Sequence, residues 1–202
     1  MARPTLNRGG LFAILASLLW TVGWIITLIA GGGSDTERVW WTLLVNPALL
    51  LFMVGLTGFH ARQTGRSGQL GKAGFAVSLL GTGTILVGNV VEFWISEYFW
   101  GTQRPGWVMM GVGLMMLPAG FVVLGIGTLR ARVFTGWRRA VPLVFGLMLA
   151  LSVIALMAVI WTDSRYSYEA HVITIFCIPL GWLALGYAVW SEKAASGDTL
   201  VG

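Results

Sequence analysis

Polar residues interrupt this chain at regular intervals and leave six apolar stretches between them. Each stretch is close to the ~20 residues that an α-helix needs to cross the hydrocarbon core of a bilayer. The pattern therefore predicts an all-α integral membrane protein, with residues 1–202 forming a single domain of six transmembrane helices. The expected helices cover residues 10–30, 42–61, 73–95, 106–129, 139–161 and 170–190.

The first apolar stretch has to be distinguished from a cleaved signal sequence, because Arg3 and Arg8 precede it. Signal sequences have a shorter apolar region and end in a small-residue cleavage site of the A-x-A kind. Here the stretch is long and is followed only by Gly31-Gly32-Gly33-Ser34. We therefore expect it to be retained as the first helix.

Basic and acidic residues are unevenly divided between alternate connecting segments, which would lie on opposite sides of the membrane. The set of segments that includes both termini holds ten basic residues and only Glu192 and Asp198 as acids. The alternate segments hold three basic residues (Arg38, Arg104 and Arg165) and six acidic ones. Lys and Arg are retained on the cytoplasmic side of membrane proteins. The pattern predicts a multi-pass protein of the cell membrane with both termini in the cytoplasm. The ten basic residues are Arg3, Arg8, Arg62, Arg66, Lys72, Arg130, Arg132, Arg138, Arg139 and Lys193.

Composition supports the membrane assignment and limits the partners. Hydrophobic residues make up 56% of the chain and charged residues 10%, whereas soluble domains carry about 25% charged residues. The basic character follows from the inner loops, so we expect no nucleic-acid partner. The expected partners are the lipid bilayer, anionic lipid at the cytoplasmic loops, and other membrane proteins or a second copy of the chain.

An internal repeat is also indicated. PAGFVVLGIGTLRAR (118–132) aligns without gaps to PLGWLALGYAVWSEK (179–193), and residues 46–62 match more loosely, with Gly55 opposite Gly125. ASLLWT (16–21) likewise resembles VSLLGT (77–82). We expect three tandem helical hairpins, at about 10–65, 70–136 and 138–197, related by an axis along the membrane normal. One helix of each hairpin would then lie near the axis, around either a cavity or a closed seam of small residues.

The third helix carries the strongest polar signal inside the membrane. Its polar residues share one helical face by their spacing, and polar groups at such depth usually face protein or a cavity. Two interpretations remain open: a site for a cation, proton or substrate, or hydrogen bonding between packed helices. Partners are expected among Thr21, Trp24, His171 and Arg165. The residues of this face are Ser78, Thr82, Asn89 and Glu92.

Polar residues near the outer end of the last helix form a second candidate set, Asp163, Arg165, Glu169 and His171. Their spacing matches no metal-ligand pattern. His60 lies at the opposite side of the membrane from His171, about 30 Å away, so the two cannot share one metal or haem. The single cysteine, Cys177, permits no intrachain disulfide. We therefore expect no metal and no cofactor.

No enzyme template is present: the chain lacks G-x-S-x-G, H-E-x-x-H and a Walker loop. The sequence therefore predicts a non-enzymatic bundle, either an accessory subunit of a complex or a small-ligand-binding protein. The alternative is a small transporter or channel that uses the polar face of the third helix. That alternative needs a polar face on at least one other hairpin too. The first helix offers Ser17 and Thr21 in matching positions, and the fifth helix offers only Ser152.

Overall fold

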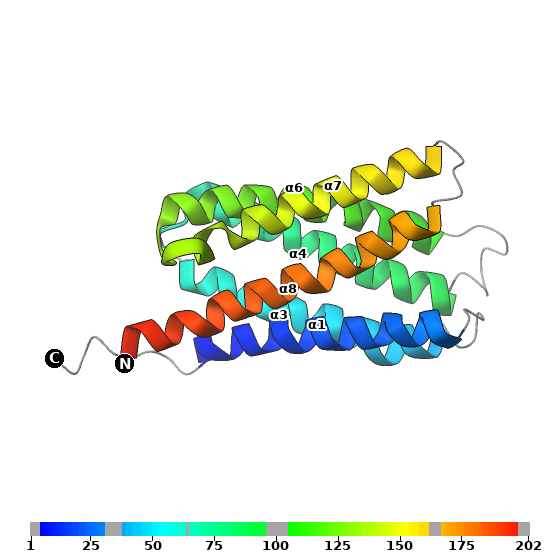
Figure 1. Cartoon of the computed structure of the whole chain (residues 1–202), viewed down its shortest axis with the longest axis horizontal. Helices are drawn as coiled ribbons and strands as arrows, with labels where there is room; N and C mark the ends of the chain where they lie inside the picture. Colours follow the sequence, from blue (N-terminus) through cyan, green and yellow to red (C-terminus); the bar gives the residue numbers. More distant parts are fainter. Residues whose placement is uncertain (1–4, 31–37, 64, 96–104, 162–166, 198–202) are drawn as a thin grey trace.

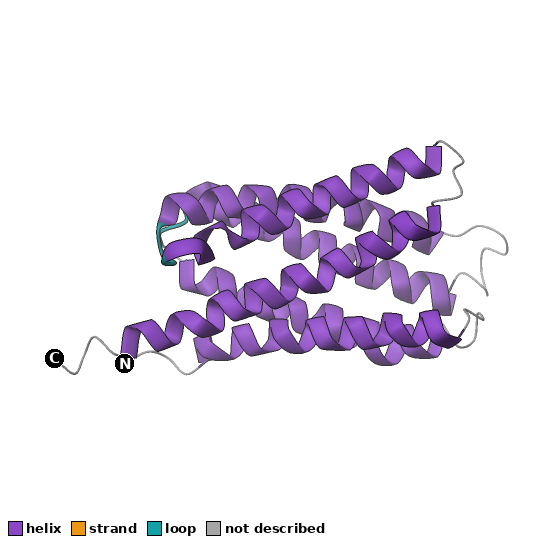
Figure 2. Cartoon of the chain, viewed as in Figure 1, coloured by secondary structure: helices purple, strands orange, loops and turns teal. Residues whose placement is uncertain are grey.

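The structure is a computed structural model of the chain. It describes residues 5–30, 38–63, 65–95, 105–161 and 167–197, and within these ranges only the backbone of 5–7, 30, 159–161, 167–172 and 192–197. The regular elements in the described part are all helical (Figure 2).

Six long helices make up the fold, and shorter turns extend three of them. The long helices are α1 (Thr5–Ala30), α3 (Asn46–Gln63), α4 (Gly68–Val90), α6 (Pro105–Ala131), α7 (Val141–Trp161) and α8 (Ser167–Gly197). The π-helical turns η1 (Trp41–Val45) and η2 (Val91–Ile95) adjoin α3 and α4, and the 3-10 turn η3 (Gly136–Ala140) leads into α7.

The sequence prediction of six helices long and apolar enough to span a membrane is confirmed. The largest differences from the predicted boundaries are at three helix ends: α1 begins at Thr5 rather than at 10, α4 begins at Gly68 rather than at 73, and α8 continues to Gly197 rather than ending at 190. Hydropathy marks the part of a helix that is apolar. Backbone hydrogen bonding continues into the neighbouring polar residues, so the helices extend beyond their apolar stretches.

The helices form a ring in chain order. Each long helix contacts the next one along the chain, and α8 returns to contact α1. We call the end of the bundle where α1 begins and α8 ends the terminal end, and the opposite end the far end (Figure 1).

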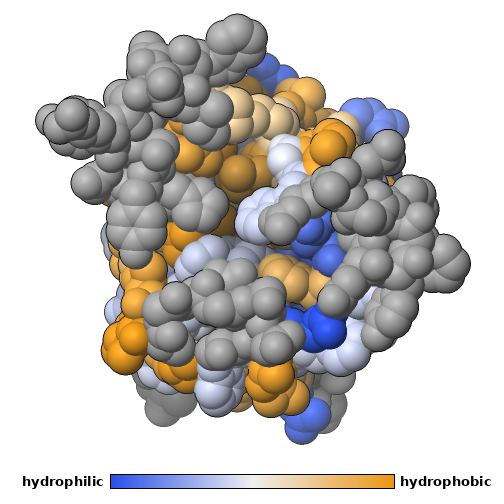
Figure 3. Space-filling model, turned by 90° about the vertical axis from the view of Figure 1, so that its right-hand side faces the viewer, coloured by the Kyte–Doolittle hydropathy of each residue, from blue (hydrophilic) through white to orange (hydrophobic). Residues whose placement is uncertain are grey.

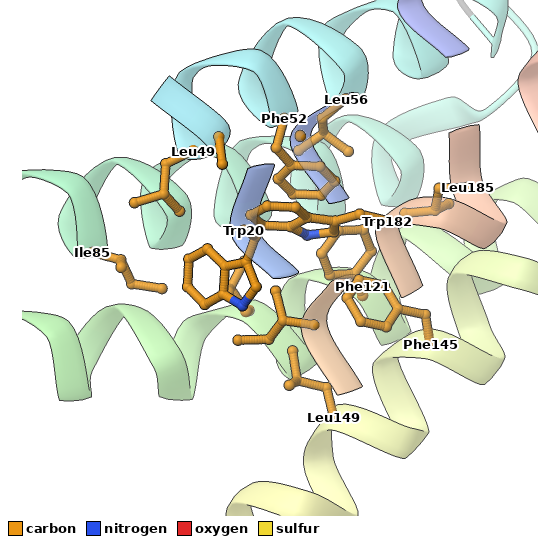
Figure 4. Close-up of a cluster of buried hydrophobic side chains, with 14 of the residues drawn as sticks. Trp20, Leu49, Phe52, Leu56, Ile85, Phe121, Phe145, Leu149, Trp182 and Leu185 are labelled. Carbon is orange, nitrogen blue, oxygen red and sulfur yellow. The ribbon is translucent and has the colours of Figure 1, made fainter. Parts of the chain in front are cut away.

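Aromatic side chains fill the central axis of this ring of helices. Phe52 of α3 stacks on Trp182 of α8 at 4.0 Å between ring centroids, and Phe121 of α6 lies 6.0 Å from Phe52 (Figure 4). All three side chains are at most 1% exposed. The sequence left open whether the axis holds a cavity or a closed seam of small residues. In the described part of the axis the seam is closed, and it is made of aromatic side chains instead of small residues.

The seam between α1 and α8 depends on a proline. Pro179 has no N–H, so the Ile175 carbonyl one turn earlier lacks its helical donor. Trp20 Nε1 of α1 donates to that oxygen at 3.1 Å, and Ser17 Oγ donates to the Pro179 carbonyl at 2.8 Å. An unsatisfied carbonyl in an apolar surrounding costs several kcal/mol. These two hydrogen bonds therefore fix α1 against α8.

The seam between α4 and α6 depends on glycine. Positions 74, 78, 81, 85 and 88 of α4 alternate in steps of four and three, which keeps one face toward α6. A Cβ on Gly88 would lie 2.8 Å from the Gly106 carbonyl oxygen, and one on Gly81 would lie 3.0 Å from the Gly113 oxygen. The two backbones are in direct contact, which resembles the small-residue helix interfaces of membrane proteins.

Candidate functional site

The polar face of α4 is inside the bundle and is occupied by helix–helix contacts. Ser78, Thr82 and Asn89 are each 0% exposed. Ser78 lies against Gly120 of α6: a Cβ added to Gly120 would be only 2.5 Å from Ser78 Oγ. Thr82 Oγ1 donates to the Ser78 carbonyl of its own helix at 2.8 Å. Both side chains are small and are buried between packed helices, and Ser78 Oγ has no hydrogen-bond partner among the described residues.

Asn89 is placed differently, because it pairs with a residue of another helix. Its Nδ2 donates to Asn46 Oδ1 of α3 at 3.1 Å. Its own Oδ1 is buried and has no hydrogen-bond partner among the described residues. A buried acceptor of this kind costs free energy unless water or a ligand satisfies it. On the polar face, Asn89 Oδ1 and Ser78 Oγ are therefore the described atoms with unused hydrogen-bonding capacity.

Two π-helical turns flank the Asn46–Asn89 pair. Asn46 directly follows η1, and Asn89 lies two residues before η2. A π turn adds a residue to a helical turn and re-aims the side chains beside it; such turns are rare and frequent at functional sites. Here they occur on both sides of one buried polar contact, at the far end of neighbouring helices.

Glu92, in the η2 turn, has a structural partner that the sequence did not suggest. Its Oε2 accepts a hydrogen bond from the Trp107 backbone N–H at 3.3 Å, in the first turn of α6. The first N–H groups of a helix lack internal acceptors, and a carboxylate there is also favoured by the helix dipole. Glu92 therefore caps α6. The hydrogen bonds of Asn89 and Glu92 described here go to Asn46 and to the Trp107 backbone. Of the expected partners, Thr21 donates to the Ser17 carbonyl of its own helix. Arg165 lies outside the described residues and only the backbone of His171 is described, so those two pairings stay predictions.

Several aromatic residues lie at the same end of the bundle as the polar pair. Trp24 of α1 packs edge-on against Trp41 of η1 at 5.0 Å, and Trp41 lies 5.4 Å from Phe93 of η2. The Arg38 guanidinium lies over the Trp94 ring at 5.3 Å. Figure 3 looks onto this end; where grey segments do not cover it, hydrophilic side chains are bordered by apolar ones. The far end thus combines a buried amide pair with a set of contacting aromatic rings.

The second candidate set is only partly placed. Asp163 and Arg165 lie outside the described residues. Glu169 and His171 belong to the first part of α8, where the backbone alone is described. His60 is stacked on Phe75 at 4.2 Å. In the described part of the chain, no group of three or more His, Cys, Asp or Glu side chains could hold a metal ion.

Sequence reasoning missed a second buried polar link, near the terminal end. Gln63 and Thr128 are both 0% exposed, and Gln63 Nε2 lies 2.9 Å from Thr128 Oγ1. Their contact joins the end of α3 to the end of α6. Gln63 follows Arg62 and resembles a solvated loop residue in the sequence, so no pattern there distinguishes it.

Two apolar grooves open on the outer surface of the bundle. One, of about 490 Å³, lies between α1, α3 and α4 and includes Phe12, Met53 and Leu79. The other, of about 400 Å³, lies between η3, α7 and α8 and includes Trp137, Met148 and Leu180. Both volumes fall in the range of small-molecule sites. Space for a ligand is therefore present on the outside of the ring.

Comparison with known proteins adds no assignment: no protein-family model, no curated protein and no solved structure matches this chain.

Proposed function

We propose that the chain is a non-enzymatic, multi-pass protein of the cell membrane that serves as an accessory subunit or a small-ligand-binding bundle. The observation that carries the proposal is the filled axis, where Phe52, Phe121 and Trp182 meet. With the axis filled and the grooves outside, binding on the outer surface suits this arrangement better than conduction through the ring. The occupants we propose are a membrane-protein partner or a second copy of the chain.

The orientation forms part of the proposal, with the terminal end in the cytoplasm. It is supported by the excess of Lys and Arg in the segments at that end. In a Cys177→Ser background, single cysteines at Ser34, Gln103 and Ser167 should react with an impermeant thiol reagent applied to intact cells. A cysteine at the exposed Arg66 should react only after the membrane is opened. Labelling of Arg66→Cys alone in intact cells would reverse the orientation.

A small transporter or channel is the alternative, supported by the unused Asn89 Oδ1 between two π-helical turns. A pathway along this face would require the α4–α6 contact or the aromatic layer to open. The accessory proposal and the transport proposal predict different rates of ion flux across a membrane.

Reconstituted vesicles provide that measurement. Under a Na⁺, K⁺ or proton gradient, vesicles holding the wild-type chain should leak no faster than protein-free vesicles. If transport is correct, the wild type should dissipate a gradient, and Glu92→Gln or Asn89→Ala should abolish this while the protein stays folded. Chemical cross-linking in native membranes tests the accessory proposal directly. If the chain contacts a partner or a second copy, cross-linked products larger than one chain should form. A chain that stays monomeric and conducts ions would refute the accessory proposal.

We also propose the threefold hairpin repeat, with units of about 10–65, 70–136 and 138–197. It is supported for the second and third units by matched glycine neighbours. Gly120 and Gly181 each face the first helix of their own unit, at Ser78 and Phe145. Gly125 and Gly186 each face the next helix around the ring, α7 and α1 respectively.

The first unit gives weaker support in the registers read from the sequence. Gly55 faces Ala13 in its own unit, whereas its aligned counterpart Gly125 faces the following one. Ser17 contacts α8, whereas its counterpart Ser78 contacts α6. A register that pairs Gly55 with Gly120 gives both glycines the same kind of neighbour. An experimental structure in which units two and three superpose only about an axis in the membrane plane would rule the repeat out.

A further inference from the structure

The groove between α7 and α8 has a defined floor and two apolar walls. The Phe145 ring is its floor, since it fills the space where a side chain on Gly181 would lie. Val144 and Met148 of α7 form one wall, and Leu180 and Ala184 of α8 form the other. Val144, Met148 and Leu180 are 40–58% exposed, so the groove is open along its length. Its shape suits a flexible apolar chain lying along the helices.

Aromatic side chains mark the terminal end of this groove. Trp137, which lines it, stacks on Tyr187 at 6.2 Å, and Tyr187 lies 6.3 Å from Trp190. These three rings are 46–57% exposed, near the terminal end of the bundle. Exposed Trp and Tyr rings favour the boundary between the hydrocarbon core and the headgroups. The groove therefore begins at the level of the headgroups and leads into the hydrocarbon.

Positive charge is concentrated at the same end. Arg138 and Arg139 stand in the chain between Trp137 and Ala140, which both line the groove. Arg139 is exposed, and Arg138 is partly exposed and donates to Thr135 Oγ1 at 3.3 Å. Guanidinium groups bind phosphate through paired N–H donors. An amphiphile with one phosphate end and one apolar tail matches this order of residues.

We propose that this groove binds an anionic phospholipid of the cytoplasmic leaflet. One acyl chain lies on Phe145 between α7 and α8, and the phosphate lies beside Arg138 and Arg139. The assignment to that leaflet rests on the orientation proposed above. A partner transmembrane helix fits less well, because it would contact α7 and α8 along their whole length, whereas the groove is lined only by residues from Trp137 to Met148 and from Leu180 to Ala184. Basic pockets between helices on the cytoplasmic side bind lipid headgroups in this manner.

The test uses the full chain, purified and delipidated in a neutral detergent, with bound lipid counted by native mass spectrometry. The probes are dioleoyl phosphatidylglycerol, dioleoyl phosphatidylcholine and soluble glycerol 3-phosphate. Arg138→Gln/Arg139→Gln removes the charges at the groove. Arg66→Gln/Lys72→Gln removes two exposed charges from the α3–α4 region as a matched control. Ala184→Phe fills the groove, and Ala155→Phe places the same ring on an exposed site of α7 that does not line it.

We expect wild type to bind phosphatidylglycerol more tightly than phosphatidylcholine. Arg138→Gln/Arg139→Gln should weaken phosphatidylglycerol binding roughly thirtyfold, while the control pair changes it less than threefold. Ala184→Phe should weaken both lipids, and Ala155→Phe neither. Glycerol 3-phosphate should not compete, because it lacks the chain. If Ala184→Phe fails to fold, Leu180→Trp serves as the second groove-filling variant.

Three results would overturn the proposal: equal losses in both charge pairs, full lipid binding with the groove filled, or competition by glycerol 3-phosphate. Because the binding is measured in detergent, it is independent of the labelling that tests orientation. A lipid site with the reverse orientation would therefore be recognised as a failure of the proposed topology alone.

Discussion

The α4–α6 contact and the α7–α8 contact show two ways for neighbouring apolar helices to pack. Between α4 and α6, glycines meet backbone atoms, and small polar side chains fit among them. Between α7 and α8, the Phe145 ring fills the space beside Gly181 and supports an open groove outside. Backbone contact leaves no room for a ligand at the seam. A side chain used as a wedge separates the helices and creates a surface that can bind one.

Removing the wedge should have the largest effect on stability. Phe145 is 2% exposed and also contacts Phe121 at 4.6 Å. Phe145→Ala should lower the free energy of unfolding by about 3–5 kcal/mol, as expected for a buried ring replaced by a cavity. Reversible unfolding in mixed micelles measures the loss. Leu151→Ala on the same helix, where the side chain is 68% exposed, should change it by less than about 0.5 kcal/mol.

The role of Phe145 can be tested further by filling the same space with a side chain from α8 instead of α7. Adding Gly181→Leu to Phe145→Ala refills the space from α8, so the double variant should be more stable than Phe145→Ala alone. An equal or greater loss in the double variant would show that Phe145 does not act through the space beside Gly181.

Filling the backbone contact between α4 and α6 should have the next largest effect. A Cβ on Gly113 would lie 2.5 Å from the Gly81 carbonyl oxygen, and backbone cannot rotate away. Gly113→Val should therefore cost about 1–3 kcal/mol. Gly111 lies on the same helix and has nothing within 4 Å of its ideal Cβ position, which makes Gly111→Val the matched control. Equal losses in both variants would mean that helix propensity, not contact, sets the cost.

The Asn46–Asn89 pair should contribute less, because its net value is that of one hydrogen bond between helices. A double-mutant cycle with Asn46→Ala and Asn89→Ala should give a coupling energy of about 0.6 kcal/mol, with an upper limit near 1.7 kcal/mol. A coupling energy near zero would show that the two amides do not pair in the folded protein.

The cap on α6 should have the smallest effect. Glu92→Gln keeps the shape of the side chain and removes its charge, so it should cost about 0.3–1 kcal/mol at low salt. The difference between Glu92→Gln and wild type should shrink as salt is raised, because the helix-dipole interaction is screened. A loss that is independent of salt would assign Glu92 a role other than the charge interaction.

Hydropathy predicted the six helices because each must satisfy its own backbone and present apolar side chains, and both requirements are local. The burial of Ser78, Thr82 and Asn89 on one face followed from helical spacing in the same way. Their partners did not follow, because pairing depends on the rotation and offset of one helix against another. Asn46, Gln63 and the two π-helical turns were missed for that reason. The capping role of Glu92 could have been recognised only by knowing that α6 begins beside it.

The hydrogen bond from Trp20 to the Ile175 carbonyl also constrains the biosynthesis of this protein. Its two ends are 155 residues apart in the chain. The first helix leaves the ribosome long before the last one exists, so during synthesis Trp20 and Ser17 have no access to their acceptors on α8. The ring can close only after translation has reached the final helix. A nascent chain that stops after α7 would leave Trp20 Nε1 and Ser17 Oγ without their acceptors, which distinguishes a truncated product from the finished protein.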